Sequence, residues 1–366
     1  MTTDKFGDLT VNVPWSSQED LLLDVAAPTL DESVERGETE SWFYLRETKE
    51  SNSYLRLKFR TRSPSVEARL RARISEAVGE AGRENLFEYR PYNKEHDWLG
   101  GPAALHIAES FWTDTTPLAV ASLRETRGNR ALRMALAFDM LACSGAFLAT
   151  RLPESVSRFG YRAGYLSYLA TFEGYMLLIR DPEKARERHV RRYELNRDAL
   201  RPRLRRLMEI MREPDGNLDG LPEPTLRYMN SLRSHLPAVQ KGFDEGRFYL
   251  YATPRKDDFS KLTPAPDGLY RRPDLPWLAD APEPPVAGIH RAIADNPYYQ
   301  GMIREDRRFQ ASRVAQAYGH WHLFRLGFLL SDRYTLCYLV ARSFEEEFGL
   351  DAAELIRSVQ PGTEVR

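Results

Sequence analysis

Residues 41–46 read Ser-Trp-Phe-Tyr-Leu-Arg, and residues 54–60 read Tyr-Leu-Arg-Leu-Lys-Phe-Arg. A polar stretch, Thr-Lys-Glu-Ser-Asn-Ser at 48–53, separates them. In the second stretch Tyr, Arg, Lys and Arg alternate with Leu, Leu and Phe, which is the period-two pattern of a strand with one buried face. The two stretches therefore predict a pair of half-buried strands.

Outward from this pair, the sequence pattern is mostly helical. Ser65 is a suitable N-cap, and Gly100-Gly101-Pro102 predicts a turn that starts a helix, because Pro is well tolerated at the first helical position. Helices are predicted over residues 65–80, 129–150, 161–178, 182–212, 220–242, 305–330 and 333–348, and further strands over 87–92 and 247–252. Antiparallel strands near the N-terminal part, packed with a mostly helical remainder, indicate an α+β fold.

Two segments lack this regular pattern. Residues 1–40 are polar and acidic with two prolines, and they predict a lead-in arm. Residues 263–285 contain seven prolines and no sustained periodicity. A loop of this length is a lid, a docking arm or a disordered segment.

Composition excludes several classes of protein. The chain has 52 Lys and Arg against 53 Asp and Glu, a formal net charge of −1 that gives no whole-chain case for nucleic acid binding. Two cysteines, Cys143 and Cys337, do not suffice for a disulfide framework. Residues 1–15 lack the regions of a signal peptide, and no run reaches the roughly 18 apolar residues of a membrane span. We therefore expect a cytoplasmic protein with no membrane partner.

The common catalytic motifs are missing from the sequence. It has no phosphate-binding glycine loop, no Gly-x-Ser-x-Gly elbow and no His-Glu-x-x-His helix. His320 and His322 are close in sequence, but two residues apart they point to opposite sides of a helix. We expect neither a metal nor another cofactor.

Three ordered blocks carry a family resemblance. Residues 42–46 and 54–58 form the first block, and residues 92–102 read Tyr-x-x-Glu-x-x-Trp-Leu-Gly-Gly-Pro. Residues 320–326 read His-Trp-His-Leu-Phe-Arg-Leu. In this order they resemble the C-terminal, elimination domain of the lantibiotic dehydratases, a family that includes thiopeptide pyridine synthases. The resemblance implies one catalytic domain over residues 1–366.

The resemblance assigns roles by position. In the dehydratases this domain eliminates glutamate from glutamylated Ser or Thr, which needs a base and cations for the departing group. The arginine of the first block falls on Arg46 or Arg56, the family glutamate on Glu95 and the family histidine on His320. Each is also readable as an ordinary strand, surface or core residue.

At three positions the chain departs from the dehydratase pattern. Trp98 stands where an arginine is expected, Phe324 where an asparagine is expected, and Tyr54 where a histidine is expected. A lost cationic anchor removes a contact of roughly 1.5–3 kcal/mol. The departures favour the pyridine synthase branch, with glutamate elimination by a split dehydratase and a non-catalytic leader-binding protein as alternatives.

Pyridine synthases join two dehydroalanines of a ribosomal peptide in a formal [4+2] aza-cycloaddition, and water and the leader-peptide amide leave. The chemistry needs orientation of the peptide and groups that exchange protons. Similarity to this branch favours Tyr318 and Ser312 as catalytic residues, with His320 next and Glu95 a further candidate. On an ideal helix Ser312, Gln316 and His320 share a face within about 80°, and Tyr318 lies on the other side.

The expected partner is a precursor peptide with an acidic leader and a core that bears azoles and dehydroalanines. Trp98 and Trp321 are candidates to stack on azole rings, although core packing is the commoner role for tryptophan. Nine arginines lie between residues 186 and 206, against Glu187, Glu194 and Asp198.

This arginine-rich stretch is either a solvated helix face or a docking surface for the leader. Arg191, Arg192 and Arg205 are its candidate contacts. An extended leader that adds to a sheet edge is the expected mode of binding. Other maturation enzymes are possible partners, while tRNA is used by a different domain in this family.

Overall fold

The computed structural model describes residues 6–49, 52–80, 99–176, 179, 181–213, 216–250 and 288–360. The predicted strand at 87–92, the proline-rich loop at 263–285 and the candidates Glu95 and Trp98 lie outside these ranges. The chain divides into two compact units. The first comprises Met1–Glu95, Leu105–Ala135 and Tyr318–Leu330, and the second His96–Ala104, Leu136–Ala317 and Ser331–Arg366.

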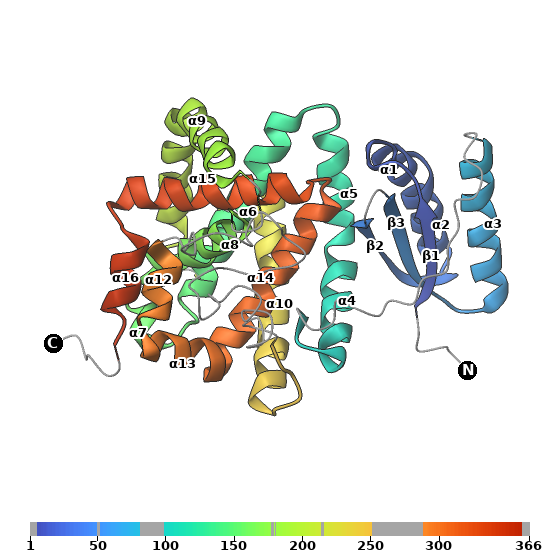
Figure 1. Cartoon of the computed structure of the whole chain (residues 1–366). Helices are drawn as coiled ribbons and strands as arrows, with labels where there is room; N and C mark the ends of the chain where they lie inside the picture. The colour runs from blue at the N-terminus through green and yellow to red at the C-terminus, as the bar shows by residue number, and fades with distance from the viewer. Residues whose placement is uncertain are drawn as a thin grey trace, which may run out of the picture. The chain divides into compact units, whose positions relative to one another are not determined.

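The first unit is built on a three-stranded antiparallel sheet. Its strands are β1 (Gly7–Asn12), β2 (Thr39–Lys49) and β3 (Asn52–Thr61), in the order β1-β3-β2. The helices of this unit are α1 (Trp15–Leu21), a π-helix (Leu22–Ala26), α2 (Ala27–Glu35), α3 (Pro64–Glu80), α4 (Leu105–Asp114) and α5 (Thr116–Glu125). In Figure 1 the strands lie between α3 on one side and α4 and α5 on the other. The predicted strand pair is confirmed as β2 and β3.

The strands are buried on both faces, which corrects the expectation of a half-buried pair. Leu55 and Leu57 of β3 are fully buried, but the alternate residues Arg56 and Lys58 are buried as well. The covered cations have acidic neighbours, since the Lys58 ammonium lies 2.8 Å from a carboxylate oxygen of Asp8. Polar and apolar residues therefore alternate in a central strand with paired charges just as they do in a strand with one face in water.

Residues 7–35, expected to form part of a polar arm, fold as β1, α1, the π-helix and α2. Strand β1 pairs with β3 along its whole length, with Val11 opposite Leu55. Val11, Leu22 and Leu30 are fully buried. Asp20, Asp24 and Glu35 are exposed on the short helices, so an apolar stripe was present beneath the polar composition.

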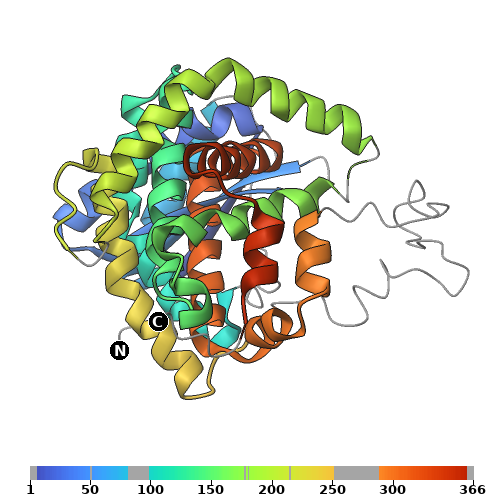
Figure 2. The same cartoon turned by 90° about the vertical axis from the view of Figure 1, so that its left-hand side faces the viewer.

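The second unit is helical. It contains most of α6 (Arg130–Ala149) and α14 (Arg307–Arg325), both of which also contribute residues to the first unit. Its other helices are a 3-10 turn (Pro102–Ala104), α7 (Glu154–Ser157), a 3-10 helix (Gly160–Tyr165), α8 (Leu166–Met176), α9 (Pro182–Ile210), α10 (Glu223–Asp244), α12 (Gly288–Ala294), α13 (Pro297–Glu305), α15 (Leu330–Phe348) and α16 (Ala352–Ser358). Figure 2 shows α12 and α16 side by side. A small N-terminal sheet followed by helices confirms the predicted α+β class.

The strand predicted at 247–252 is wrong over its described part. Residues 247–250 have no regular structure. The backbone N–H groups of Arg247 and Phe248 donate to the carbonyl of Gly242 at 2.9 and 3.1 Å, and so close the end of α10. The Phe248 ring is buried against Phe243, at a centroid distance of 5.9 Å. The apolar residues that suggested a strand therefore serve to cap a helix.

Helix α6 is the core helix of the chain. Among the described helices it alone is long and apolar enough to cross a membrane, and 72% of that window is buried inside the protein. Burial of this kind is typical of a core helix.

Candidate functional site

Ser312 of α14 is a buried residue of the second unit. It is 3% exposed, and its Oγ makes no hydrogen bond to any described residue. Buried hydroxyl groups in proteins nearly always have a partner. Ser312 also lines two separate cavities of this unit. The Ser312 hydroxyl is thus buried and borders two cavities.

The first of these cavities has a volume of about 240 Å³ and a mostly apolar wall. Residues from α6, α8, α12, α13 and α14 line it, among them Leu148, Ile293, Tyr299, Phe309, Arg313 and Gln316. The Gln316 side-chain amide donates to the hydroxyl of Ser167. Both of these groups are therefore already engaged.

A histidine and an arginine add polar character to the first cavity. The His290 Nε2 lies 3.1 Å from the carbonyl oxygen of Ala170, and burial lowers the pKa of His290. His290 is thus neutral near pH 7, with its proton on Nε2 and with Nδ1 as an acceptor. Burial also lowers the pKa of Arg313, and none of the described residues that line this cavity is Asp or Glu.

The second cavity is larger and charged, with a volume of about 770 Å³. Its charged lining residues are Arg151, Arg233, Arg307, Arg308, Asp244, Glu305 and Asp306. Ser312 is the residue that both cavities share. An apolar chamber and a polar one therefore border the same hydroxyl.

Tyr318 lies further along α14, in the first unit. It is 1% exposed, and its ring stacks on Phe111 with centroids 5.1 Å apart. Its hydroxyl has no hydrogen-bond partner among the described residues. Burial raises the pKa of Tyr318, so the phenol stays protonated and acts as a donor.

The other residues of this block differ in burial. His320 is half-buried and His322 is buried, and burial holds the pKa of His322 well below its ordinary value. Trp321 packs against Trp112 and Phe324, at centroid distances of 5.9 and 5.8 Å. Within the described ranges no group of three His, Cys, Asp or Glu side chains is arranged to hold a metal ion.

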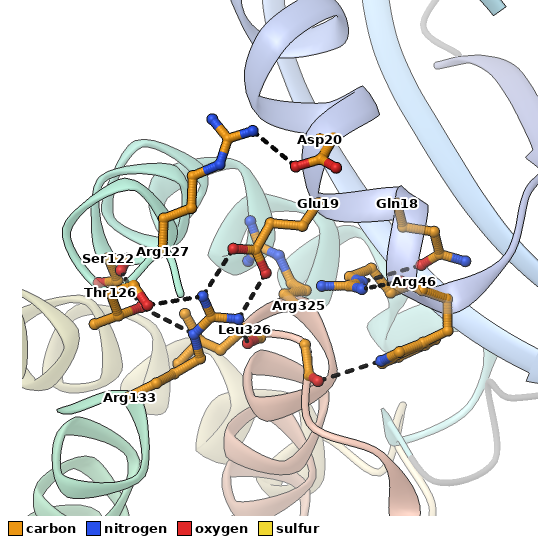
Figure 3. Close-up of polar contacts among 12 residues, drawn as sticks. Gln18, Glu19, Asp20, Arg46, Ser122, Thr126, Arg127, Arg133, Arg325 and Leu326 are labelled. Carbon is orange, nitrogen blue, oxygen red and sulfur yellow. Dashed lines mark hydrogen bonds and ion pairs between the residues drawn. The ribbon is translucent and has the colours of Figure 1, made fainter. Parts of the chain in front are cut away.

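Arg46, a predicted substrate contact, is buried inside the first unit (Figure 3). Its Nε donates to Gln18 Oε1 at 3.0 Å, its Nη2 donates to the Trp15 carbonyl at 2.9 Å, and its guanidinium lies 4.3 Å from the Trp15 ring centre. Burial lowers the pKa of Arg46 to about 10, so it remains charged at neutral pH. These contacts tie β2 to α1.

A second arginine stands beside this network. Arg133 makes two hydrogen bonds to the Glu19 carboxylate, at 2.6 and 2.8 Å (Figure 3). The carbonyl of Leu326 also accepts from Arg133 at 3.4 Å. The described part of the first unit thus engages its buried arginines internally.

Arg56 and five of the nine arginines of α9 lie close to acidic side chains. Arg56 lies 3.6 Å from the Glu47 carboxylate, and Arg205 pairs with Glu347 at 2.6 Å. Arg191 and Arg192 are exposed, and neither forms an ion pair with a described residue. Of the nine arginines, Arg186, Arg197, Arg201, Arg203 and Arg205 pair with acidic residues of the second unit.

Arg313 and His290 were not anticipated from the sequence. Arg313 follows other arginines in a polar stretch, and so it resembled a solvated position. It is half-buried and lines a cavity together with residues of α12 and α13, and sequence patterns do not place these helices beside α14. Local sequence therefore contained no signal for this cavity.

Sequence and structure comparisons give consistent results. The family model described as lantibiotic biosynthesis dehydratase C-term matches residues 9–344. A search of the curated proteins gave no match. The crystal structure of TsrL is similar at 66% identity, with a TM-score of 0.84, over 99% of this chain and 100% of that chain. TbtD, the pyridine synthase from thiomuracin biosynthesis, shares the fold at 18% identity, with a TM-score of 0.59, over 94% of this chain and 99% of that chain.

Proposed function

The chain belongs to the lantibiotic biosynthesis dehydratase C-terminal family, and on that premise we propose that it is a thiopeptide-forming enzyme. Its reaction is a formal [4+2] aza-cycloaddition between two dehydroalanines of a modified ribosomal peptide. Two new C–C bonds, from the two carbon ends of the iminol azadiene to the two carbons of the second dehydroalanine, close the six-membered ring and the macrocycle. Loss of water and of the leader peptide as an amide then aromatises the ring to a pyridine. TbtD, a pyridine synthase, has the same fold.

The observation that carries this proposal is the pair of buried hydroxyls on α14. Neither Ser312 Oγ nor the Tyr318 hydroxyl has a partner among the described residues, although both are buried. An unsatisfied buried hydroxyl costs roughly 1–3 kcal/mol, and a substrate that hydrogen-bonds to it removes this cost. Such groups suit a reaction that needs proton donors and acceptors but no anchored carboxylate.

Each candidate residue has a role that suits its state. Tyr318, a neutral phenol, donates to the amide oxygen that becomes the hydroxyl of the iminol and later leaves as water. Ser312 orients the dehydroalanine segment through its hydroxyl. His320, half-buried, serves as the acceptor for the proton that is lost as the ring aromatises. Glu95 remains a further candidate of this kind, while Trp98 and Trp321 remain candidates to stack on azoles.

Glutamate elimination is the less favoured activity. Its substrate carries a glutamyl carboxylate, which requires free cations. Arg46 and Arg56 instead contact neighbours within the first unit, and Phe324 replaces the expected asparagine. Apart from Arg313, the candidate residues of α14 carry hydroxyl and imidazole groups, which suit the cycloaddition better.

The acidic leader is proposed to dock on the exposed side of α9. Arg191 and Arg192 are exposed and unpaired among the described residues, whereas Glu347 already neutralises Arg205. The two free arginines are therefore the stronger candidates, and Arg205 is the weaker one.

The test supplies the purified protein with a leader-bearing peptide that contains azoles and two dehydroalanines. Product masses distinguish three activities. A macrocycle with free leader supports pyridine formation. Loss of glutamate from a matched glutamylated peptide indicates elimination, and binding of both peptides without any change in mass indicates a leader-binding protein.

A further inference from the structure

We propose that the 240 Å³ cavity of the second unit binds a planar ring that carries a carbonyl or carboxylate oxygen, with Arg313 and Ser312 as its polar anchors. Insofar as this ring is an azole-carbonyl unit of the peptide, the inference rests on the proposed function. The bound ring is then a part of the substrate other than the two dehydroalanines that react.

Volume and lining indicate a single ring. Drug-sized ligands occupy pockets of about 300–1,000 Å³, and a cavity of about 150 Å³ lined by apolar side chains accepts benzene. A volume of about 240 Å³ therefore suits one ring with a small substituent. The wall is mostly apolar and includes Leu148, Ile293 and Phe309. Two glycines, Gly145 and Gly164, also line the cavity, and their backbones lie against each other too closely for a Cβ on either.

The charge of the cavity selects an oxygen acceptor. Among the described residues that line it, Arg313 is the one cation, because His290 is neutral, and none carries a carboxylate. Arg313 makes no hydrogen bond or ion pair with any residue that the structure describes. Cations that leave water are normally paired. A carboxylate or carbonyl oxygen on the bound ring supplies the missing partner, and the guanidinium fork matches its geometry.

Two neutral groups complete the match to a heteroaromatic ring. Ser312 Oγ is buried and has no partner among the described residues. His290 Nδ1 is an acceptor, because Nε2 is engaged by the Ala170 carbonyl. Ser312 also borders the larger polar cavity, which offers space for the peptide chain that continues from the ring. The ring thus occupies the apolar chamber and the chain the polar one.

A direct binding measurement tests the proposal. Thiazole-4-carboxylate is titrated into the full-length protein by calorimetry, with thiazole as the probe without an oxygen and acetate as the probe without a ring. We expect the carboxylate to bind more tightly than either. Arg313→Met should weaken binding at least tenfold, and Arg313→Lys should weaken it less. Arg227→Met, at an exposed position of α10 that lines neither cavity, should leave binding unchanged.

Two results would overturn the inference. One is the absence of saturable binding to the unaltered protein, and the other is equal affinity in Arg313→Met. Retained binding in Arg313→Lys shows that loss in Arg313→Met reflects charge rather than misfolding. Thiazole-4-carboxamide, which mimics the peptide-linked ring, separates a peptide source of the ring from a free aromatic acid: binding of the carboxylate alone assigns the cavity to the acid.

The same variants separate this inference from the proposed function. If the cavity binds a ring of the peptide, Arg313→Met should raise KM for the azole-bearing peptide more than it lowers kcat. Pyridine formation that is indifferent to Arg313→Met removes the subsite and leaves the proposed function intact. If the probe binds in a way that depends on Arg313 but the protein forms no pyridine, the ring-binding cavity stands and the proposed function is wrong.

Discussion

Tyr318 and Tyr168 are both buried phenols, but their hydroxyls have different surroundings. The Tyr168 and Ser144 hydroxyls lie 3.0 Å apart and share a hydrogen bond. The Tyr318 hydroxyl has no such partner among the described residues. A hydrogen bond made within the fold contributes about 1 kcal/mol to stability, whereas a buried hydroxyl without a partner costs stability. The difference separates a structural tyrosine from one available to a substrate.

Tyr318→Phe should slow ring formation without weakening leader binding or lowering stability, because the only group removed is a donor that the fold does not use. Single-turnover rates, leader affinity and the free energy of unfolding check this. Tyr168→Phe is the matched control, and it should lose about 1 kcal/mol of stability. Normal turnover in Tyr318→Phe would remove this hydroxyl from the mechanism.

The ion pair between Arg133 and Glu19 belongs to the packing of the first unit (Figure 3). The side chains of Arg133 and Glu19 are only 12% and 18% exposed. Glu19→Gln leaves the Arg133 charge largely buried without a carboxylate, which should cost about 3 kcal/mol of unfolding free energy. Chemical denaturation measures this loss of unfolding free energy.

The control for this pair lies one residue away. Asp20 pairs with Arg127 at the surface, where both side chains are well exposed. Asp20→Asn should change stability little, since solvent screens such pairs. If Asp20→Asn and Glu19→Gln lowered the unfolding free energy equally, the buried pair of Glu19 with Arg133 would be no more important than the surface pair.

At the scale of elements, α6 and the 3-10 helix Gly160–Tyr165 cross at two glycines. A Cβ on Gly145 would lie 2.5 Å from the carbonyl oxygen of Gly164, so backbone would have to move. Gly145→Ala should therefore destabilise the protein by about 1–3 kcal/mol. Gly301 in α13 has open space around it, and Gly301→Ala should be stabilising by roughly 0.5–1 kcal/mol. Thermal unfolding compares the two, and a neutral Gly145→Ala would contradict the crossing.

The elements themselves were largely predictable, because local periodicity specifies them. The alternation over residues 54–60 predicted β3, and apolar spacing predicted α3, α9 and α15. The predicted cap Ser65 is wrong, because α3 begins at Pro64 and Ser63 Oγ accepts from the Val66 N–H at 3.4 Å. The other exceptions have tertiary causes. Phe248 and its neighbours were read as a strand but cap α10. The alternation of Arg56 and Lys58 with apolar residues predicted a half-buried strand, but both cations are covered and paired.

The candidate residues of α14 were likewise accessible from the sequence, but their environment was not. The family resemblance led to His320 by position, and similarity to the pyridine synthase branch led to Tyr318 and Ser312. The cavity beside Ser312 and the lone cation Arg313 depend on helices distant in the chain, so no local pattern could reveal them. Similarly, whether the arginines of α9 were free depended on acids such as Glu347, far along the sequence.

At the scale of the whole molecule, near-neutral net charge conceals uneven local charge. The formal charge is −1, but Arg191 and Arg192 are exposed and unpaired within the described chain. Reversing both, with Arg191→Glu and Arg192→Glu together, should weaken leader binding and reduce its salt dependence. Titration of the isolated leader at two ionic strengths measures this. The pair Arg304→Glu and Arg357→Glu is the charge-matched control, and equal effects of the two pairs would refute specific docking on α9.

The central claim is that the chain closes a pyridine and expels its leader as an amide. The most direct measurement is the mass of the leader released from an azole-bearing bis-dehydroalanine peptide in ¹⁸O-labelled water. The account predicts a leader that ends in a carboxamide without ¹⁸O, in equal amount with a dehydrated macrocycle. A leader that ends in a labelled carboxylate, or one that stays attached while a glutamylated peptide loses glutamate, would contradict it.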